Sequence, residues 1–253
     1  MPGRGLLPQR ATRGQRGLSM TLNKMFLGAV IAALAGVGFA AQANAAVIQN
    51  FSGSGIEPLD NLDVSAEVSF LIENGKITVT MTNTTPYTFA SNQVLTGLDF
   101  TLSNVNTVSM TSATGTPRSV AANGTYTDGA AASLLSTWSI LDTGTNTFSW
   151  SFNPNAEYGI IGVPEGDGDY STANGSVKNN NGHNPFSAIT GTFVITSAAI
   201  TEDTTVSDVL FRFNTNRSST VPGDDGGGEI PEPASLGVLG LGALALVARR
   251  RKA

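Results

Sequence analysis

The alternation of apolar and polar residues between Leu62 and Asn83 constrains the fold of this chain more than any other part of its sequence. Apolar side chains occupy every second position on both sides of the pair Asn74-Gly75. Period two is typical of a β-strand that buries one face. Asn-Gly between two such runs predicts a tight hairpin, because both central residues of a type I′ turn adopt positive φ.

The turn also specifies which residues of the two strands lie opposite each other. With Asn74-Gly75 at the tip, Glu73 faces Lys76. The apolar pairs on one face are then Ile72 with Ile77, Phe70 with Val79, and Val68 with Met81. The polar pairs on the other face are Ser69 with Thr80 and Glu67 with Thr82. A slip of one residue would move every apolar side chain to the polar face, so the register is strongly specified.

Four further stretches alternate in the same way. Their apolar positions are Leu98, Phe100 and Leu102; Phe148, Trp150 and Phe152; Ile189, Phe193 and Ile195; and Val209, Phe211 and Phe213. Loops rich in Gly, Asn, Ser, Thr and Pro separate them, and no helical period is sustained between residues 46 and 236. The sequence predicts an all-β domain over residues 46–213, an antiparallel, jelly-roll-like β-sandwich. The polar residues 214–229 include three consecutive glycines and are predicted to be a flexible linker.

The charges of this body limit its partners. Residues 46–230 hold five of the 14 Lys and Arg residues but 18 of the 19 Asp and Glu residues, which gives a formal charge of −13. A nucleic-acid-binding surface requires Lys and Arg, so we expect no nucleic-acid partner. A divalent cation, or water alone, suits such an acidic surface better.

Residues 1–45 are interpreted as an extension followed by a secretory signal peptide. Lys24 gives a positive region, Phe26 to Ala41 an apolar region, and the small residues Ala43 and Ala45 a cleavage site before Ala46. Residues 1–19 have no place in this arrangement. We therefore expect translation to start at Met20, with an unusually long positive region from Met1 as the alternative.

Residues 230–253 combine three features in a row. A Pro231-Glu232-Pro233 triplet comes first, then an apolar run from Leu236 to Ala248, then the basic residues Arg249, Arg250, Arg251 and Lys252. The run is shorter than the ~20 residues of an ideal membrane-spanning helix. The basic cluster should stay cytoplasmic, which places the body on the outer side. The two prolines keep the triplet extended, because each lacks an amide donor and restricts the preceding residue.

This tail resembles the PEP-CTERM sorting signal of Gram-negative bacteria, which has a Pro-Glu-Pro motif, a short transmembrane stretch and an Arg-rich end. The resemblance covers about a tenth of the chain. It implies that an integral-membrane, transpeptidase-like enzyme, exosortase, recognises the tail, removes it and passes the protein toward the cell surface. It also implies an association with exopolysaccharide and biofilm. A plain membrane anchor in the inner membrane is the alternative reading of the same residues.

Catalytic patterns are scarce in the sequence. The chain has no Cys and one histidine, His183, in an Asn- and Gly-rich loop. A single His without Cys cannot build a zinc site, and no G-x-S-x-G nucleophile elbow occurs. We expect Trp138 and Trp150 to pack in a core rather than to form a sugar-stacking platform. We therefore expect the protein not to be an enzyme.

A metal site is conceivable at one loop only. Glu165, Asp167 and Asp169 alternate with glycine, and alternating carboxylates on a loop can wrap Ca²⁺. The EF-hand pattern fails here, since Tyr170 and Ser176 stand where Gly and Glu are required. Calcium is thus a possible cofactor, against the alternative of a solvated acidic loop, and no other cofactor is expected.

Three functions follow from these observations. The first is an exported surface or extracellular-matrix protein with a structural or adhesive role, staged in the inner membrane before exosortase releases it. The second is a glycan-binding module in the exopolysaccharide matrix. The third is a secreted polysaccharide-active enzyme, which the lack of a convergent catalytic set disfavours.

Overall fold

A computed structural model describes residues 46–144, 147–152, 157–166, 168–178, 182–214 and 219–225 of the chain. The predicted signal peptide and C-terminal sorting segment lie outside these residues. All the described residues belong to one compact unit.

The described part of the chain consists of β-strands, one 3-10 turn (η1) and loops, without an α-helix. The all-β prediction is therefore confirmed. The elements are β1 (Val47–Glu57), β2 (Leu62–Glu73), β3 (Lys76–Asn83), η1 (Ser91–Gln93), β4 (Leu95–Leu102), β5 (Ser109–Val120), β6 (Tyr126–Asp128), β7 (Ala132–Ser133), β8 (Trp138–Gly144), β9 (Thr147–Phe152), β10 (Ile160–Ile161), β11 (Phe186–Thr196), β12 (Val206–Phe213), β13 (Ser219–Pro222) and β14 (Asp224–Asp225).

β2 and β3 form the predicted hairpin. Every predicted pair is present in its register, from Glu73 with Lys76 at the tip to Glu67 with Thr82. The carboxylate of Glu73 lies 2.8 Å from Lys76 Nζ, and Gly75 has a φ of 78°. All six apolar side chains of the predicted inner face are buried. The register followed from the sequence because one face is apolar and the turn is unambiguous.

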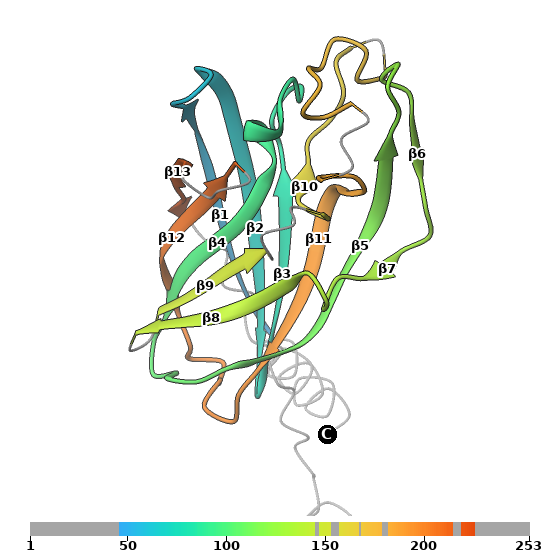
Figure 1. Cartoon of the computed structure of the whole chain (residues 1–253). Helices are drawn as coiled ribbons and strands as arrows, with labels where there is room; N and C mark the ends of the chain where they lie inside the picture. Colours follow the sequence, from blue (N-terminus) through green and yellow to red (C-terminus); the bar gives the residue numbers. More distant parts are fainter. Residues whose placement is uncertain are drawn as a thin grey trace, which may run out of the picture. The chain divides into compact units, whose positions relative to one another are not determined.

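The strands form one sheet that nearly closes on itself. Neighbours along the sheet follow the order β13-β12-β4-β10-β11-β3-β2-β1-β14 (Figure 1). β13 and β14 end this order on opposite sides, yet only Gly223 separates them in the sequence. A sandwich of two facing sheets is therefore not confirmed, because one sheet encloses the core. β10 and β11 are parallel, the single exception among the described strand pairs to the predicted antiparallel arrangement.

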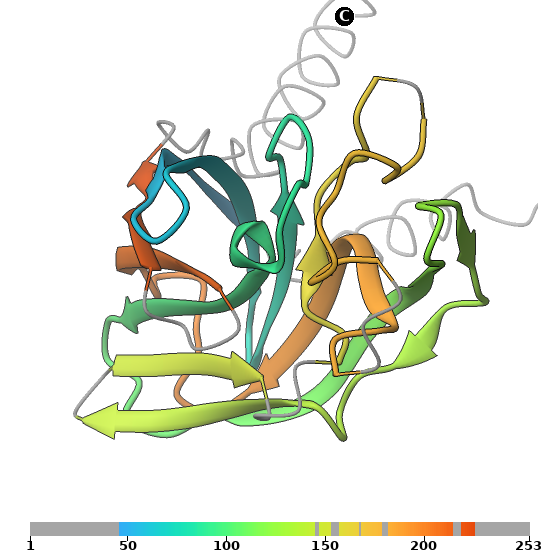
Figure 2. The ribbon, with the colours of Figure 1, turned by 45° about the horizontal axis from the view of Figure 1, so that its top comes forward.

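The β8–β9 hairpin extends from β4 toward β11 and β5 (Figures 1 and 2). β9 pairs with β4, and β8 contacts β5. Trp138, at the start of β8, is buried against Phe193 of β11, with ring centroids 4.8 Å apart. Its indole N–H donates to the carbonyl of Tyr158 at 3.0 Å. Trp138 is therefore a core residue, as its sequence context predicted.

The main core lies inside this sheet. It joins aromatic and aliphatic side chains from β1, β2, β3, β4, β11, β12 and β13. The ring of Phe70 packs edge-on against Phe51 and Phe100, with centroids 5.8 and 5.1 Å away. Such edge-to-face contacts add to the stabilisation that burial itself provides.

A second, smaller core lies under the loop that follows β10. It contains Tyr170, Val177 and Phe186, with Tyr126 packed against it. Arg118 of β5 is buried beside it, with Nε and Nη2 each 2.7 Å from the carboxylate of Asp128. Its Nη1 donates to the Tyr170 hydroxyl at 3.1 Å, and that hydroxyl donates to the carbonyl of Gly162 at 2.7 Å.

The predicted linker is partly wrong. β13 pairs with β12, and β14 pairs with β1, so the sheet extends through residues 219–225. Val221 of β13 is buried in the main core. A short, polar, Gly-rich composition predicts a linker, whereas the strands here are defined by pairing partners that are distant in the sequence.

Candidate functional site

Most residues of the predicted targeting signals lie outside the described residues. These are Ala43 and Ala45 of the cleavage site, the triplet Pro231, Glu232 and Pro233, and the basic residues Arg249, Arg250, Arg251 and Lys252. Ala46, predicted to be the first residue after cleavage, directly precedes β1 and is half-buried. The structure therefore gives no geometry for the sorting site or for most of the cleavage site, and both stay predictions.

The predicted calcium loop is described in part. Glu165 is exposed, and its carbonyl accepts from the amide of Gly168 at 2.9 Å, which closes a turn. One Asp169 carboxylate oxygen accepts from the Ser171 amide at 2.8 Å. A hydrogen bond from the Ser171 side chain, the bond from its amide and the positive charge of Lys178 lower the pKa of the Asp169 carboxyl. Asp167 lies outside the described residues, so the three-carboxylate set stays a prediction.

His183 is half-buried, and burial lowers the pKa of its imidazole. Its Nδ1 has no hydrogen-bond partner among the described residues. A catalytic His needs a group that orients it, usually a carboxylate on this nitrogen. The surroundings that are described therefore contain no orienting acid for His183.

A groove runs along the outer face of β1 and β2. It consists of three hollows of about 300, 240 and 320 Å³. Neighbouring hollows share Ser52 and Glu67 in one case, and Ser54 and Ser65 in the other, so they are continuous. We call this the β1–β2 groove. At ~3.3 Å per residue, its length from Asn50 to Ile56 is about 20 Å.

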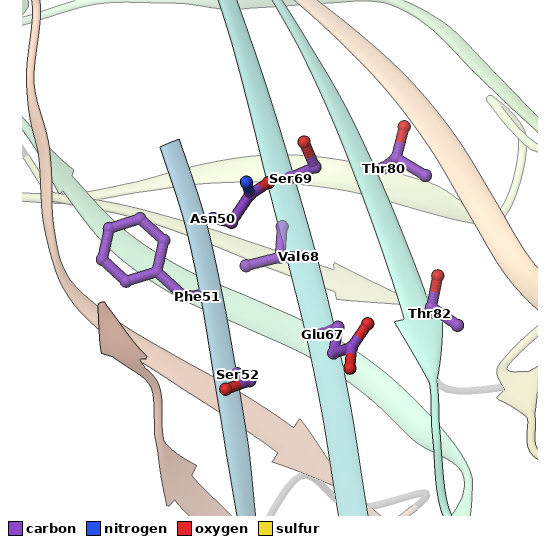
Figure 3. A pocket seen from close by; sticks show the side chains of 8 residues that line it. All are labelled: Asn50, Phe51, Ser52, Glu67, Val68, Ser69, Thr80 and Thr82. Carbon is purple, nitrogen blue, oxygen red and sulfur yellow. The ribbon is translucent and has the colours of Figure 1, made fainter. Parts of the chain in front are cut away.

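The strand register builds the floor of this groove from rows of polar side chains. Asn50 lies opposite Ser69, and Ser69 opposite Thr80. In the next row, Ser52 lies opposite Glu67, which lies opposite Thr82. Figure 3 shows these side chains on three neighbouring strands. They line up because successive side chains of a strand point to opposite faces of the sheet, and the alternate positions of β1, β2 and β3 face the core.

Most of these polar groups keep their hydrogen-bonding capacity. Asn50, Ser52, Glu67, Ser69 and Thr80 line the groove, and their side chains bond to no other described residue. Asn50, Ser52 and Glu67 are exposed. The groove can therefore offer hydroxyl, amide and carboxylate groups to a ligand.

One end of the groove meets an exposed apolar region. Ile56 and Pro86 line this end. The amide of buried Gln93 donates to the carbonyl of Asp63, at 2.8 Å, and to that of Tyr87, at 3.2 Å. This shared donor holds the Tyr87 backbone next to the groove. Tyr87 is 44% exposed.

The described groove residues carry negative charge only. Asp63, Glu67 and Asp224 line it, and no Lys, Arg or His does. The hairpin register by itself places Ser69, Thr80, Glu67 and Thr82 on one face, but it does not mark that face as a site. The missing information was β1, whose strand was not predicted and which supplies half of the groove.

Comparison with known proteins identifies the tail. The family model described as the PEP-CTERM protein-sorting motif matches residues 229–252. A search of the curated proteins found no match to this sequence. In the part of the chain that the structure describes, no helix has the length and apolarity needed to cross a membrane. The match supports the predictions of export and of recognition by exosortase, and the chain carries a PEP-CTERM sorting motif.

Proposed function

We propose that this chain is a protein of the cell surface or extracellular matrix with a structural or adhesive role linked to exopolysaccharide or biofilm. The observation that supports this most directly is the PEP-CTERM match at residues 229–252. An acidic, cysteine-free, all-β body is compatible with such a role outside the cell.

The proposed route has two stages. The signal peptide ending at Ala45 exports the body, while the segment from Leu236 to Ala248 holds the protein in the inner membrane. Exosortase then cuts at or near Pro231 to Pro233 and releases the body toward the surface. The last described strand ends at Asp225, so five residues separate it from Pro231. Six extended steps from Asp225 to Pro231 reach at most about 20–22 Å, which sets the greatest distance of the triplet from the end of β14.

Mass spectrometry of both termini tests this route. The protein should be purified from the membrane, surface and medium fractions of its host. We expect a start at Ala46 and an end near Pro231 to Pro233 in the surface or medium fraction. A chain that still ends at Ala253 and stays in the membrane would contradict the route.

Matched variants make the test specific. Glu232→Ala alters the triplet, and Asp225→Ala removes an exposed carboxylate outside the matched residues. We expect Glu232→Ala to accumulate the uncut form and Asp225→Ala to be processed normally. If both variants are processed equally, the Glu232 side chain is not needed for recognition of the triplet by exosortase.

The groove favours a second candidate, a glycan-binding module of the matrix.

We also propose that the protein is not an enzyme, which is supported by the lack of an orienting acid near His183 in the described residues. Incubation with polysaccharides, followed by measurement of reducing ends, checks this. Release of new reducing ends would establish the enzyme alternative instead.

A further inference from the structure

The β1–β2 groove combines features that select one class of ligand. It is about as long as seven strand residues, so it suits an extended polymer better than a compact small molecule. Five of its polar side chains bond to no other described residue, so they are available to donate or accept hydrogen bonds: Asn50, Ser52, Glu67, Ser69 and Thr80.

The groove lies on a sheet face, not at a free edge. β2 pairs with β1 on one side and with β3 on the other, so its backbone groups are committed to the sheet. A peptide that adds a strand needs a free edge with unpaired backbone groups. The groove presents side chains, whose mixed donors and acceptors match the hydroxyl groups of a polyol.

The negative charge of the groove further restricts the class of ligand that it can bind. Asp63, Glu67 and Asp224 give the groove three carboxylates without a cation among its lining residues. A polymer of uronic acids or a nucleic acid would be repelled, whereas an uncharged chain would not. Carboxylates also accept hydrogen bonds from hydroxyl groups more strongly than neutral acceptors do.

The exposed Tyr87 at the groove end supplies an apolar surface. Ile56 and Pro86 line this end, and the exposed Tyr87 directly follows Pro86 in the chain, so apolar groups are available here to cover the C–H face of a sugar ring. Aromatic side chains with one apolar face and one polar tip are well suited to ligands that are both polar and apolar.

We propose that the β1–β2 groove binds a linear polysaccharide without acidic groups, lying along the strands with one end at Tyr87. This inference deepens the proposed matrix function and rests on it. Mapping of the termini tests only the sorting route, and the binding measurements test only the groove. Failure of one proposal can therefore be distinguished from failure of the other.

The test uses the full chain purified in detergent. Binding is measured by calorimetry against neutral linear polysaccharides of several linkages, a polymer of amino sugars, a polymer of uronic acids, and an extended peptide. We expect saturable binding to a neutral polymer and none to the uronic acid polymer. Binding of the amino-sugar polymer alone, abolished by salt, would show simple ion exchange and overturn the proposal.

Two variants locate the site. Thr80→Val removes a groove hydroxyl at nearly constant volume and should weaken binding about threefold to tenfold. Tyr87→Ala should weaken it by at least about threefold. The matched control is Thr127→Val, at an exposed position of β6 away from the groove. Equal binding in all three variants, preference for the peptide, or no binding to any neutral polymer would overturn the proposal.

Discussion

Arg118 illustrates how single polar residues are kept inside this β protein. Its side chain is almost fully buried, and its guanidinium is 4.0 Å from the centroid of the Tyr126 ring. Asp128 holds two of its nitrogens in parallel hydrogen bonds, and the Tyr170 hydroxyl holds the third. Burial raises the pKa of Tyr170, and the hydrogen bond and positive charge of Arg118 oppose this rise. The planar guanidinium suits this set of partners better than a lysine would.

The Arg118–Asp128 pair predicts a pH-dependent stability. The guanidinium lowers the pKa of the Asp128 carboxyl below its ordinary value. The stabilisation is therefore complete above the unfolded pKa of about 3.9 and is lost as the pH falls through the lower, folded value. Because Asp128 is partly exposed, we expect Asp128→Asn to lower the free energy of unfolding by only about 1–2 kcal/mol at pH 7.

Urea unfolding at pH 7 and pH 3 measures this difference. The gap between the wild-type protein and Asp128→Asn should shrink at pH 3. Asp203→Asn, at an exposed position, serves as the control and should change little at either pH. A gap that grows toward acid would contradict the assigned direction of the pKa.

At the scale of elements, the β2–β3 hairpin was predictable from the sequence, whereas the neighbouring strand β1 was not. β2 and β3 follow from alternation and Asn-Gly, and β4, β9, β11 and β12 were found from alternation alone. Strand β1 was not predicted because Gly53 and Gly55 occupy inward-facing positions, where apolar residues would indicate a strand. β5 contains Gly115 and Pro117, which argue against a strand by local propensity.

At Gly53, strand β1 lies so close to β13 that a larger residue does not fit. A Cβ at this position would lie 2.4 Å from the carbonyl oxygen of Pro222. We expect Gly53→Ala to lower the free energy of unfolding by about 1–3 kcal/mol, because backbone atoms cannot move aside cheaply. Thermal unfolding checks this value.

The matched control is Gly129→Ala. A Cβ there would meet its nearest atoms at 3.7 Å, an ordinary contact distance. We expect a change within about 0.5 kcal/mol. If both glycine variants lose equal stability, the close approach of β1 and β13 is not the cause.

The loop with Glu165, Asp167 and Asp169 carries the calcium prediction. We expect calcium at 100 times its dissociation constant to stabilise the fold by about 2.7 kcal/mol, seen as a higher melting temperature that a chelator reverses. Asp167→Asn should remove the effect, whereas Asp203→Asn should keep it. A melting temperature that is indifferent to calcium and chelator would leave this loop as a solvated acidic turn.

At the scale of the whole molecule, the ends of the described chain meet in the sheet. β14 pairs with β1 at Phe51 and Ser52, and β13 continues from β12. Residues distant in the sequence thus complete one core, in which Val221 is buried. The strands next to the predicted export site and next to the sorting motif are therefore hydrogen-bonded neighbours.

This arrangement predicts the effect of truncation. A chain of residues 46–225 should keep its stability, whereas a chain of residues 46–214 should lose about 2 kcal/mol or more. The reason is that Val221 and its neighbours no longer cover the core. Urea unfolding of the two truncated forms measures the difference. Equal stability would show that β13 and β14 contribute nothing to the closed sheet.

The sequence by itself determined the hairpin register, the all-β class and the sorting motif. Each of these depends on contiguous residues: an alternation around Asn74-Gly75, or a triplet, an apolar run and a basic end in fixed order. Tertiary structure alone decided the near-closure of the sheet, the strands within the predicted linker and the groove. The groove depends on β1, whose inward glycines Gly53 and Gly55 interrupt the apolar alternation. The near-closure and the linker strands arise where β1 meets β13 and β14, and 157 residues separate Gln49 from its hydrogen-bond partner Val206. Local periodicity carries no signal for pairings that are completed over such distances.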